Sequence, residues 1–274
     1  MEKQKITAEN AVAISQRIGK RSYCNSPYWL AENCSYEERN GEALVYINDR
    51  TLNETYLLFT PTKKENITTK RICLATKEDI ERLKKKGITI AKTTVQGAEY
   101  YYRTKDLIEM KGKTYSRCRK AVSQFTRNYK FKILHVYPAQ KVVDFIKNWA
   151  AAKNLSKHTE TARKLFEWDL DNCIKYVGLR KKLPTKRIYI EIDGKLAAFA
   201  FVHPLFPDLF VALQQKVDIK YKGLSRFLYH EKAKLYPNIE MFTVGTAAET
   251  EGLEAFKEEL HPAKKEEWFM ITLA

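Results

Sequence analysis

The sequence predicts a mixed α/β (α+β) protein whose two tandem domains each contain a mixed central sheet. The length, 274 residues, suits one large domain or two of about 130 residues each, and we expect two. Hydrophobic residues make up 44% of the chain and aromatic residues 12%, which is typical of a folded protein with a buried core. In both halves, short β-rich runs alternate with segments of helical periodicity, which favours helices packed against sheets.

The first half contains signals for a hairpin, a strand and a helix. Residues 43–47 and 55–59 are β-rich runs on either side of a turn-prone stretch, so we expect a hairpin. Residues 70–74 have the composition of a further strand. A helix is expected over 76–86, because Thr76 can cap it, acidic residues follow, and Gly87 ends it.

A strongly basic segment closes this half. Residues 111–132 contain eight basic residues and no acidic one. Apolar residues recur within the segment at spacings of 3, 4, 3 and 4, which predicts one buried face of a helix. These apolar positions are Tyr115, Cys118, Val122, Phe125 and Tyr129. We expect an N-terminal domain over residues 1–132 that ends with this helix, and a C-terminal domain over residues 133–274.

The second half shows a regular order of elements. Two helices are expected over 142–152 and 160–177, and a basic loop follows them. Asp193-Gly194 is a two-residue turn typical of a hairpin, here between strands at 187–192 and 195–202. The remaining expected elements are a strand at 209–217, a helix at 223–235, a strand at 240–244, a helix at 252–260 and a strand at 268–273.

The composition limits the partners and the compartment. Lysine and arginine number 49 against 33 acidic residues, a net charge of +16, so we expect a polyanionic partner such as RNA, DNA, a nucleotide or an acidic membrane surface. A plain role of these charges in solubility is the alternative. Five scattered cysteines without metal-ligand spacing favour free thiols, a cytoplasmic location and no metal site. The sequence has no N-terminal apolar core and no long apolar window, so we expect neither export nor a transmembrane segment.

One turn in the second half has the composition of an anion-binding site. The strand at 209–217 leads through Lys220, Gly223 and Ser225 into a helix, and the amides at a helix N-terminus suit a phosphate or an oxyanion. The alternative is an ordinary strand-to-helix connection. P-loop, dinucleotide-binding, nucleophile-elbow and zinc-protease motifs are absent from the sequence, so the corresponding enzyme classes lose support.

A wider pattern of residues resembles a known family. Its members in this chain are, in order, Tyr100-Tyr101-Tyr102, Lys111-Gly112-Lys113, Tyr115, Asp193-Gly194-Lys195, Gln215-Lys216, Gly223 and Gly252-Leu253. This order is similar to that of the C-terminal domain of phosphatidylglycerol lysyltransferases, which are related to the Fem peptidoglycan transferases. The resemblance spans roughly residues 95–265 and implies two tandem GNAT-like (N-acetyltransferase-like) domains.

The resemblance also implies an activity. An acyltransferase of this kind moves an aminoacyl group from aminoacyl-tRNA to an amine or hydroxyl acceptor, without a covalent enzyme intermediate and without a separate cofactor. The acceptor is unknown, and a lipid headgroup or a small molecule would fit. The tRNA would bind a basic surface, although a merely solvated surface is the alternative. The residues expected to face tRNA are Lys111, Lys113, Arg117, Arg119, Lys120, Arg180 and Lys181.

The same resemblance implies the site residues. Phe256-Lys257 after Gly252-Leu253 resembles a pair that lies near the tRNA acceptor end in Fem-like enzymes, where the lysine stabilises charge on the transferring ester. With Gly223, these two are the expected catalytic residues; an ordinary amphipathic helix is the alternative. The expected substrate-binding residues are Gln215, Lys216, Tyr221, Ser225, Thr246 and Glu249.

One segment departs from the family pattern. Lysyltransferase relatives carry a polar run resembling Asn-Arg-Glu-x-Asp before the Gly-Leu pair, whereas residues 243–249 of this chain are Thr-Val-Gly-Thr-Ala-Ala-Glu. The departure implies a different substrate or a lost activity. This departure keeps open a non-catalytic RNA-binding protein on the same fold. The Gly223 turn separately keeps open an acyl-CoA-dependent N-acyltransferase that binds pyrophosphate there.

Overall fold

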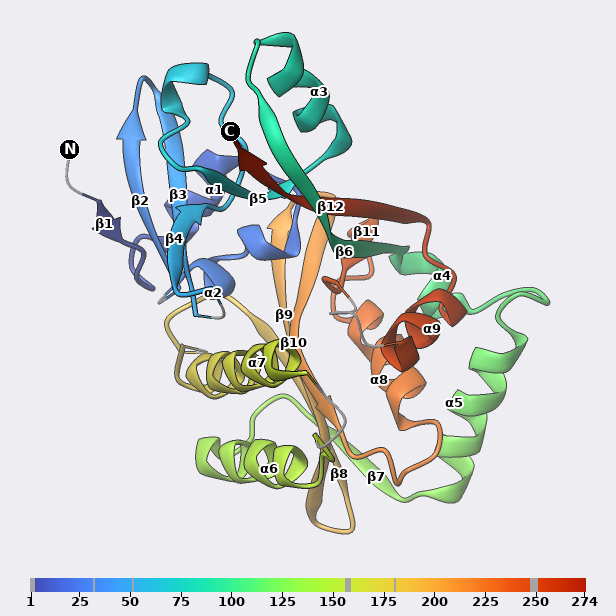
Figure 1. Cartoon of the computed structure of the whole chain (residues 1–274). Coiled ribbons are helices and arrows are strands. Elements are labelled where there is room, and N and C mark those ends of the chain that lie inside the picture. The colour runs from blue at the N-terminus through green and yellow to red at the C-terminus, as the bar shows by residue number, and fades with distance from the viewer. Residues whose placement is uncertain (1–2, 32, 51, 156–158, 180, 247–250) are drawn as a thin grey trace.

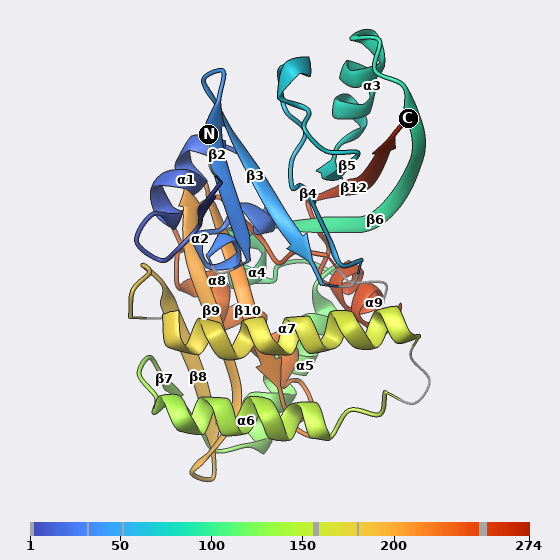
Figure 2. The same cartoon turned by 60° about the vertical axis from the view of Figure 1, so that its left-hand side comes forward.

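The chain folds around one extended mixed sheet with helices on both faces (Figures 1 and 2). The computed structural model describes residues 3–31, 33–50, 52–155, 159–179, 181–246 and 251–274. Strands and helices alternate along the whole chain, and both parallel and antiparallel strand pairs occur. The predicted mixed α/β class is confirmed.

The N-terminal part contributes five strands to one end of the sheet. They are β1 (Gln4–Lys5), β2 (Cys34–Arg39), β3 (Glu42–Asp49), β4 (Glu54–Leu57) and β5 (Arg71–Ala75). β3 and β4 pair antiparallel with Tyr46 opposite Leu57, which confirms the predicted hairpin. The short helical elements of this part are α1 (Ala11–Ile18), η1 (Tyr23–Asn25), α2 (Pro27–Leu30) and η2 (Lys64–Asn66).

The helix α3 (Lys77–Lys85) forms where the sequence predicts it. The Thr76 hydroxyl accepts a hydrogen bond from the Asp79 amide, and the Asp79 carboxylate accepts one from the Thr76 amide. This reciprocal cap satisfies two amides that have no partner inside the helix.

The C-terminal strand returns to the N-terminal part of the sheet. β12 (Lys264–Leu273) lies between β5 and the long strand β6 (Ile90–Arg103), and it runs antiparallel to both. On its other side β6 pairs with β11 (Met241–Thr243), with Phe242 opposite Tyr102. Strands from the two halves of the sequence therefore interleave, and the predicted division of the chain at residues 132–133 stays a prediction.

Four strands complete the other end of the sheet. They are β7 (Phe131–Leu134), β8 (Lys186–Ile192), β9 (Lys195–Phe206) and β10 (Leu209–Val217). The turn between β8 and β9 has positive φ angles at Asp193 (50°) and Gly194 (74°), as the predicted two-residue hairpin requires. The complete strand order is β1-β2-β3-β4-β5-β12-β6-β11-β10-β9-β8-β7.

Helices cover the two faces of β8, β9 and β10 differently. On one face lie α6 (Ala139–Ala151) and α7 (Glu160–Leu179), which pack on Tyr189, Phe199 and Phe201. On the other lie α5 (Ser116–Asn128) and α8 (Leu224–Lys234), which pack on alternate residues such as Ile188 and Ile190. Alternation along a strand thus assigns each residue to one of two cores. α4 (Thr104–Glu109) and α9 (Glu251–Glu259) lie on the α8 side (Figure 1).

The basic helix is shorter than the sequence predicts. α5 ends at Asn128, and Lys132 lies in the edge strand β7, paired with Glu191 of β8. The apolar stripe is confirmed, because Tyr115, Cys118 and Phe125 are buried. The periodicity of five residues located the helix, but it carried no information on where the chain leaves it.

Candidate active site

The sheet opens where β10 and β11 diverge. The two strands pair in parallel only from Leu209 and Met241 to Val211 and Thr243. β10 then continues to Val217, while β11 ends and the chain turns away. The phenol of Tyr23 bridges this opening, because it donates a hydrogen bond to the carbonyl oxygen of Leu213. Past Val211, β10 therefore has no β11 partner among the described residues, and the Tyr23 hydroxyl takes the place of one ladder donor.

Lys257 of α9 lies at the end of β11. Its amine donates to three successive carbonyl oxygens, those of Val244 (3.3 Å), Gly245 (2.8 Å) and Thr246 (2.6 Å). The side chain is buried, and burial lowers the pKa of Lys257 to about 7, although the Glu99 carboxylate acts in the opposite direction. Three acceptors match the three N–H groups of an ammonium, so this contact set favours the charged form. Lys257 therefore fixes the segment that follows β11.

A second buried lysine lies on the neighbouring helix. Lys232 of α8 is fully buried, donates to the side-chain oxygen of Gln215, and sits 3.4 Å from the ring centroid of Tyr229. Burial and the nearby charge of Lys257 lower the pKa of Lys232 well below its ordinary value. The sequence analysis missed this residue. Lys232 stands four positions after Leu228, on the buried stripe of α8, and a lysine on such a stripe was the available signal.

Glu99 of β6 is a buried carboxylate that acts on the pKa of Lys257, and it too was missed. It is 1% exposed and accepts hydrogen bonds from the Tyr23 amide (2.6 Å) and the Thr243 hydroxyl (2.6 Å). Ser22 and the Trp268 indole are further donors to it, at 3.0 Å and 3.2 Å. Burial raises the pKa of Glu99. Its four donors connect η1, β11 and β12, so Glu99 holds the base of the opening together.

The structure gathers several predicted site residues around this opening. Gln215 approaches the Tyr229 hydroxyl (3.4 Å), and the ring of Phe256 packs edge-on against Tyr229 at 5.4 Å. Thr246 lies over Gly97 of β6 and accepts from Lys257. Gln215, Thr246, Phe256 and Lys257 therefore form one cluster with Lys232.

Other predicted residues lie elsewhere. Lys216 follows Gln215 on β10 and points to the opposite face, where its amine is 2.8 Å from the Asp169 carboxylate. Tyr221 packs edge-on against Tyr129 at 5.2 Å, in the connection before α8. Ser225 is half-buried in the first turn of α8. Glu249 and Arg180 lie outside the described residues.

The position of Gly223 has a packing explanation. Its φ is 87°, and a Cβ atom built there would overlap the carbonyl oxygen of Ala121 in α5. Only glycine allows the two helices to approach this closely. The requirement for glycine therefore comes from α5, and the expected oxyanion or phosphate role of Gly223 stays a prediction.

The predicted tRNA-facing residues fall on two different faces. Lys113, Arg117 and Lys120 are exposed on and before α5. Lys111 pairs with Glu109 at 3.0 Å, and Arg119 donates to the carbonyl oxygens of Met110 and Gly112. Lys181 is exposed just after α7, the helix that lies on the opposite face of the sheet from α5 (Figure 1). The structure thus separates Lys181 from the α5 group.

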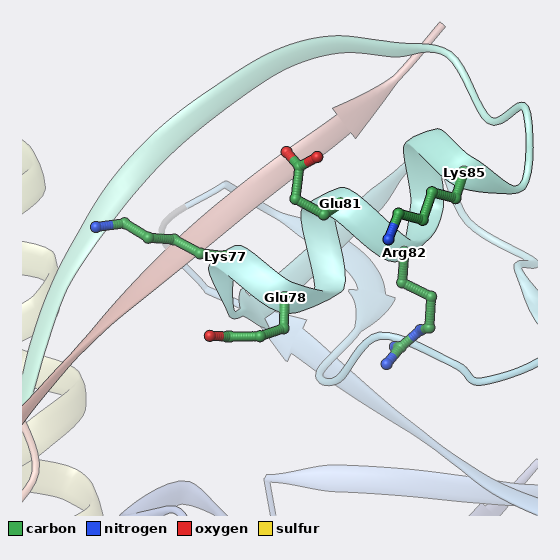
Figure 3. A pocket seen from close by; sticks show the side chains of 5 residues that line it. All are labelled: Lys77, Glu78, Glu81, Arg82 and Lys85. Carbon is green, nitrogen blue, oxygen red and sulfur yellow. The ribbon is translucent and has the colours of Figure 1, made fainter.

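Two cavities lie away from the opening. One is a shallow depression of about 440 Å³ beside α3, lined by Lys77, Glu78, Glu81, Arg82 and Lys85 (Figure 3). The other, of about 530 Å³, lies between α6 and the segment after β10. Within the described part of the chain, no helix is long and apolar enough to cross a bilayer. The same residues contain no group of three His, Cys, Asp or Glu side chains placed to hold a metal ion.

Most of the chain matches one known protein family. The sequence profile described as "Phosphatidylglycerol lysyltransferase, C-terminal" matches residues 71–272. The chain belongs to this family. The match includes β5 to β12, and hence both sides of the opening. No curated protein sequence matches the chain.

Solved structures of low sequence identity share the fold of this family member. A conserved protein of unknown function from Bacteroides thetaiotaomicron is 16% identical, covers 100% of both chains and gives a TM-score of 0.82. L-PGS from Bacillus licheniformis is 12% identical over 98% of this chain and 92% of the other, with a TM-score of 0.67. A tandem GNAT protein from the clavulanic acid biosynthesis pathway is 10% identical over 98% and 97%, with a TM-score of 0.50. The predicted GNAT-like tandem fold is confirmed, and membership of this transferase family supports an acyltransferase-type function.

Proposed function

We propose that the chain transfers an aminoacyl group from aminoacyl-tRNA to an amine or hydroxyl acceptor, at the opening between β10 and β11. The observation that carries the proposal is the placement of Lys257 and Lys232 where the sheet diverges, as two buried amines that pair with no carboxylate among the described residues. Buried ionisable groups with perturbed pKa values are concentrated at functional sites. Membership of the lysyltransferase family supports the reaction class.

The reaction needs no covalent enzyme intermediate. The acceptor nitrogen or oxygen attacks the ester carbonyl carbon, the bond to the tRNA ribose oxygen breaks, and the proton lost by the acceptor ends on that ribose oxygen. Negative charge develops on the carbonyl oxygen in the transition state, and a fixed ammonium beside it is a large source of stabilisation. Lys257 supplies that ammonium by redirecting the N–H group that makes its longest contact, 3.3 Å to Val244.

The exposed basic residues on and before α5 are the proposed tRNA surface. The side chains of Lys113, Arg117 and Lys120 make no hydrogen bond or ion pair with any other described residue, so their charges are free to meet phosphates. The donor is a cosubstrate and no separate cofactor takes part. The acceptor carries an amine or hydroxyl, and both lipid headgroups and small molecules offer one. We place the reaction in the cytoplasm, where charged tRNA is available.

An acyl-CoA donor is the second candidate. The observation that favours it is the strand-to-helix connection from β10 to α8, with Lys220 exposed before the first turn and Ser225 within it. Such a connection suits a pyrophosphate. The packing of Gly223 against α5 weakens this candidate, because it accounts for the glycine without a ligand.

The experiment that separates the candidates is a competition for binding. Purified protein is titrated with labelled aminoacyl-tRNA at moderate salt, and excess deacylated tRNA and excess acetyl-CoA are added as separate competitors. Displacement by tRNA and not by acetyl-CoA supports the aminoacyl-tRNA donor. Displacement by acetyl-CoA supports the second candidate, and the absence of any aminoacyl-tRNA binding contradicts the proposal.

A further inference from the structure

A cavity on the α6 side of the sheet has no role in the proposed reaction. Its volume is about 530 Å³, within the range of about 300–1,000 Å³ that is usual for small-ligand pockets. α6 forms one wall, and the β8–β9 turn and the segment after β10 form the other (Figure 2). The opening that holds Lys257 and Lys232 lies on the opposite side of β10. The cavity is therefore separate from the candidate active site.

Aromatic side chains line this cavity. Tyr137, Phe145 and Trp149 come from α6 and the residues before it, and Tyr221 comes from the connection to α8. Trp149 is held in place, because its indole donates to the Val217 carbonyl oxygen (3.2 Å) and Phe166 stacks on its ring at 5.9 Å. Fixed aromatic rings offer flat surfaces for stacking at low entropic cost.

The charge of the lining is mainly positive. Its basic members are Lys141, Lys153, Lys195 and Lys220, and its acidic members are Asp144 and Asp218. Asp218 is already paired with Lys220 at 2.8 Å, and Asp144 accepts a hydrogen bond from Gln140 at 2.8 Å. Lys141 and Lys195 are exposed and make no ion pair with any side chain in the described residues. Two ammonium groups on opposite walls are thus available to an anion.

Two cations lie over the Trp149 ring, and one of them is the buried Lys216 amine, which is 4.9 Å from the ring centroid and paired with Asp169. The Lys153 amine lies 4.6 Å from the centroid of the Trp149 ring, and Lys153 itself is only half-buried. A cation over an indole face marks a place where an aromatic base can stack instead, because both are held by the electron-rich ring face. A displaced Lys153 would remain near the rim as a third positive group.

We propose that this cavity binds a nucleoside phosphate, with its base against Trp149 and Tyr221 and its phosphate between Lys141 and Lys195. Ring faces and uncompensated lysines are the two features that nucleotide recognition combines. The same chemistry can come from a free nucleotide or from the end of an RNA strand. The inference goes beyond the proposed function and does not rest on it, because the cavity and the opening lie on opposite sides of β10.

The test is a binding titration of the full-length chain with two probes. The first probe is fluorescently labelled AMP, and the second is a labelled single-stranded oligoribonucleotide that ends in CCA. The test variant is the double change Lys141→Glu and Lys195→Glu. The matched control is Lys70→Glu with Lys92→Glu, which alters the net charge by the same amount. Both lysines are exposed and lie away from the cavity: Lys70 directly precedes β5, and Lys92 belongs to β6.

We expect the test variant to lose at least about tenfold in affinity for a probe that the wild type binds, and the control to lose less than about threefold. Thermal melting checks that both variants stay folded. Mutual competition of the two probes assigns the cavity to the RNA end, and binding of AMP without competition by the oligoribonucleotide assigns it to a free nucleotide. Equal losses in the two variants, or no binding of either probe by the wild type, would overturn the inference.

The two proposals can fail separately. If the wild-type protein binds aminoacyl-tRNA but neither small probe, the proposed function stands and the proposal for this cavity fails. If the protein binds AMP, with an affinity that depends on Lys141 and Lys195, but does not bind aminoacyl-tRNA, the cavity proposal stands and the proposed donor is wrong.

Discussion

Buried lysines on the two sides of β10 differ in their partners and in the direction of their pKa shifts. On the α7 face, Lys216 is 7% exposed and lies 2.8 Å from the Asp169 carboxylate. On the α8 face, Lys232 and Lys257 are at most 2% exposed and form no ion pair with any described residue. Their amines donate to amide oxygens, and Lys232 also lies over the Tyr229 ring. Burial lowers the pKa of Lys216, but Asp169 outweighs burial and the pKa lies above its ordinary value. The pKa values of Lys232 and Lys257 lie below theirs.

We infer from this difference that Lys216 is structural and that Lys232 and Lys257 belong to the proposed active site. A paired ammonium keeps its proton across the neutral range and ties α7 to β10. A buried amine without a counterion costs stability, because desolvation is not offset by an opposite charge. Buried groups that carry such a cost are concentrated at active sites. The α8 face is therefore where the reaction is proposed.

The largest effect on stability is expected at Gly223, which sets how α8, and hence Lys232, sits against α5. Gly223→Ala places a methyl group into the Ala121 carbonyl oxygen at a positive φ. We expect a loss of about 2–4 kcal/mol in the free energy of unfolding. Denaturant unfolding measures it, with Gly252→Ala as the control, because a Cβ at Gly252 meets no atom within 4 Å and its φ is not positive. Equal stability of the two variants would contradict the packing account.

The next effect tests the paired face. Lys216→Met leaves Asp169 without its cation, and because Asp169 is 47% exposed, water takes over part of that role. We expect a loss of about 1–3 kcal/mol in the free energy of unfolding. Lys232→Met, of similar shape change on the other face, should be neutral or stabilising, since it removes a buried amine that has no counterion in the described part of the chain. A larger loss for Lys232→Met than for Lys216→Met would reverse the comparison.

The pH dependence of stability sharpens the same contrast. The pKa of Lys257 is about 7 in the folded chain and has its ordinary value of 10.5 when unfolded. Between these values the unfolded chain binds more protons, so Lys257 makes stability rise with pH, by up to about 1.4 kcal/mol per pH unit. Below pH 7 both states are protonated and the cost of burial is present in full.

This slope is measured by urea unfolding between pH 7.5 and 9. Lys257→Met should flatten the rise relative to the wild type, by up to about 1.4 kcal/mol per pH unit. Lys186→Met is the control, because that lysine also donates to a backbone carbonyl oxygen, that of Leu235, but is exposed. Identical slopes in the wild type and Lys257→Met would show that Lys257 keeps its proton throughout.

The smallest effect concerns the basic surface. Arg117→Glu with Lys120→Glu should reduce the slope of log affinity for tRNA against log salt by about 1–2, one step for each lost phosphate contact. The pair Lys70→Glu and Lys92→Glu carries the same charge change away from α5 and should alter the slope less. Filter binding at several salt concentrations measures both. Indistinguishable slopes would mean that net charge, and not α5, attracts the RNA.

The sequence predicted local elements well and long-range neighbours poorly. Asp193-Gly194 and the Thr76 cap are decided by a few adjacent residues, and both form as expected. The placement of β12 between β5 and β6 joins residues far apart in the chain, and no local pattern encodes it. β6 itself was missed because its first half, with exposed lysine and threonine residues, lacks a clear hydrophobic alternation.

The site was predicted in part for a related reason. The family resemblance located Lys257 and Gln215, which the structure brings into one cluster with Lys232. Neighbours in sequence need not share a site, however, because Gln215 and Lys216 point to opposite faces of one strand. Glu99 stayed hidden because its four donors come from η1, β11 and β12 as well as the residue before η1.

The most direct test of the proposed active site measures how fast a Lys257 variant transfers aminoacyl groups from tRNA to an acceptor. Bulk tRNA charged with labelled amino acids is incubated with enzyme and hydroxylamine, which serves as a generic amine acceptor, and the labelled hydroxamates are counted under single-turnover conditions. Lys257→Met should lower the rate by about 100-fold or more, the usual loss for a transition-state donor, while Lys186→Met retains it. If the wild type is active and Lys257→Met is equally active, the assignment of the reaction to this opening is contradicted.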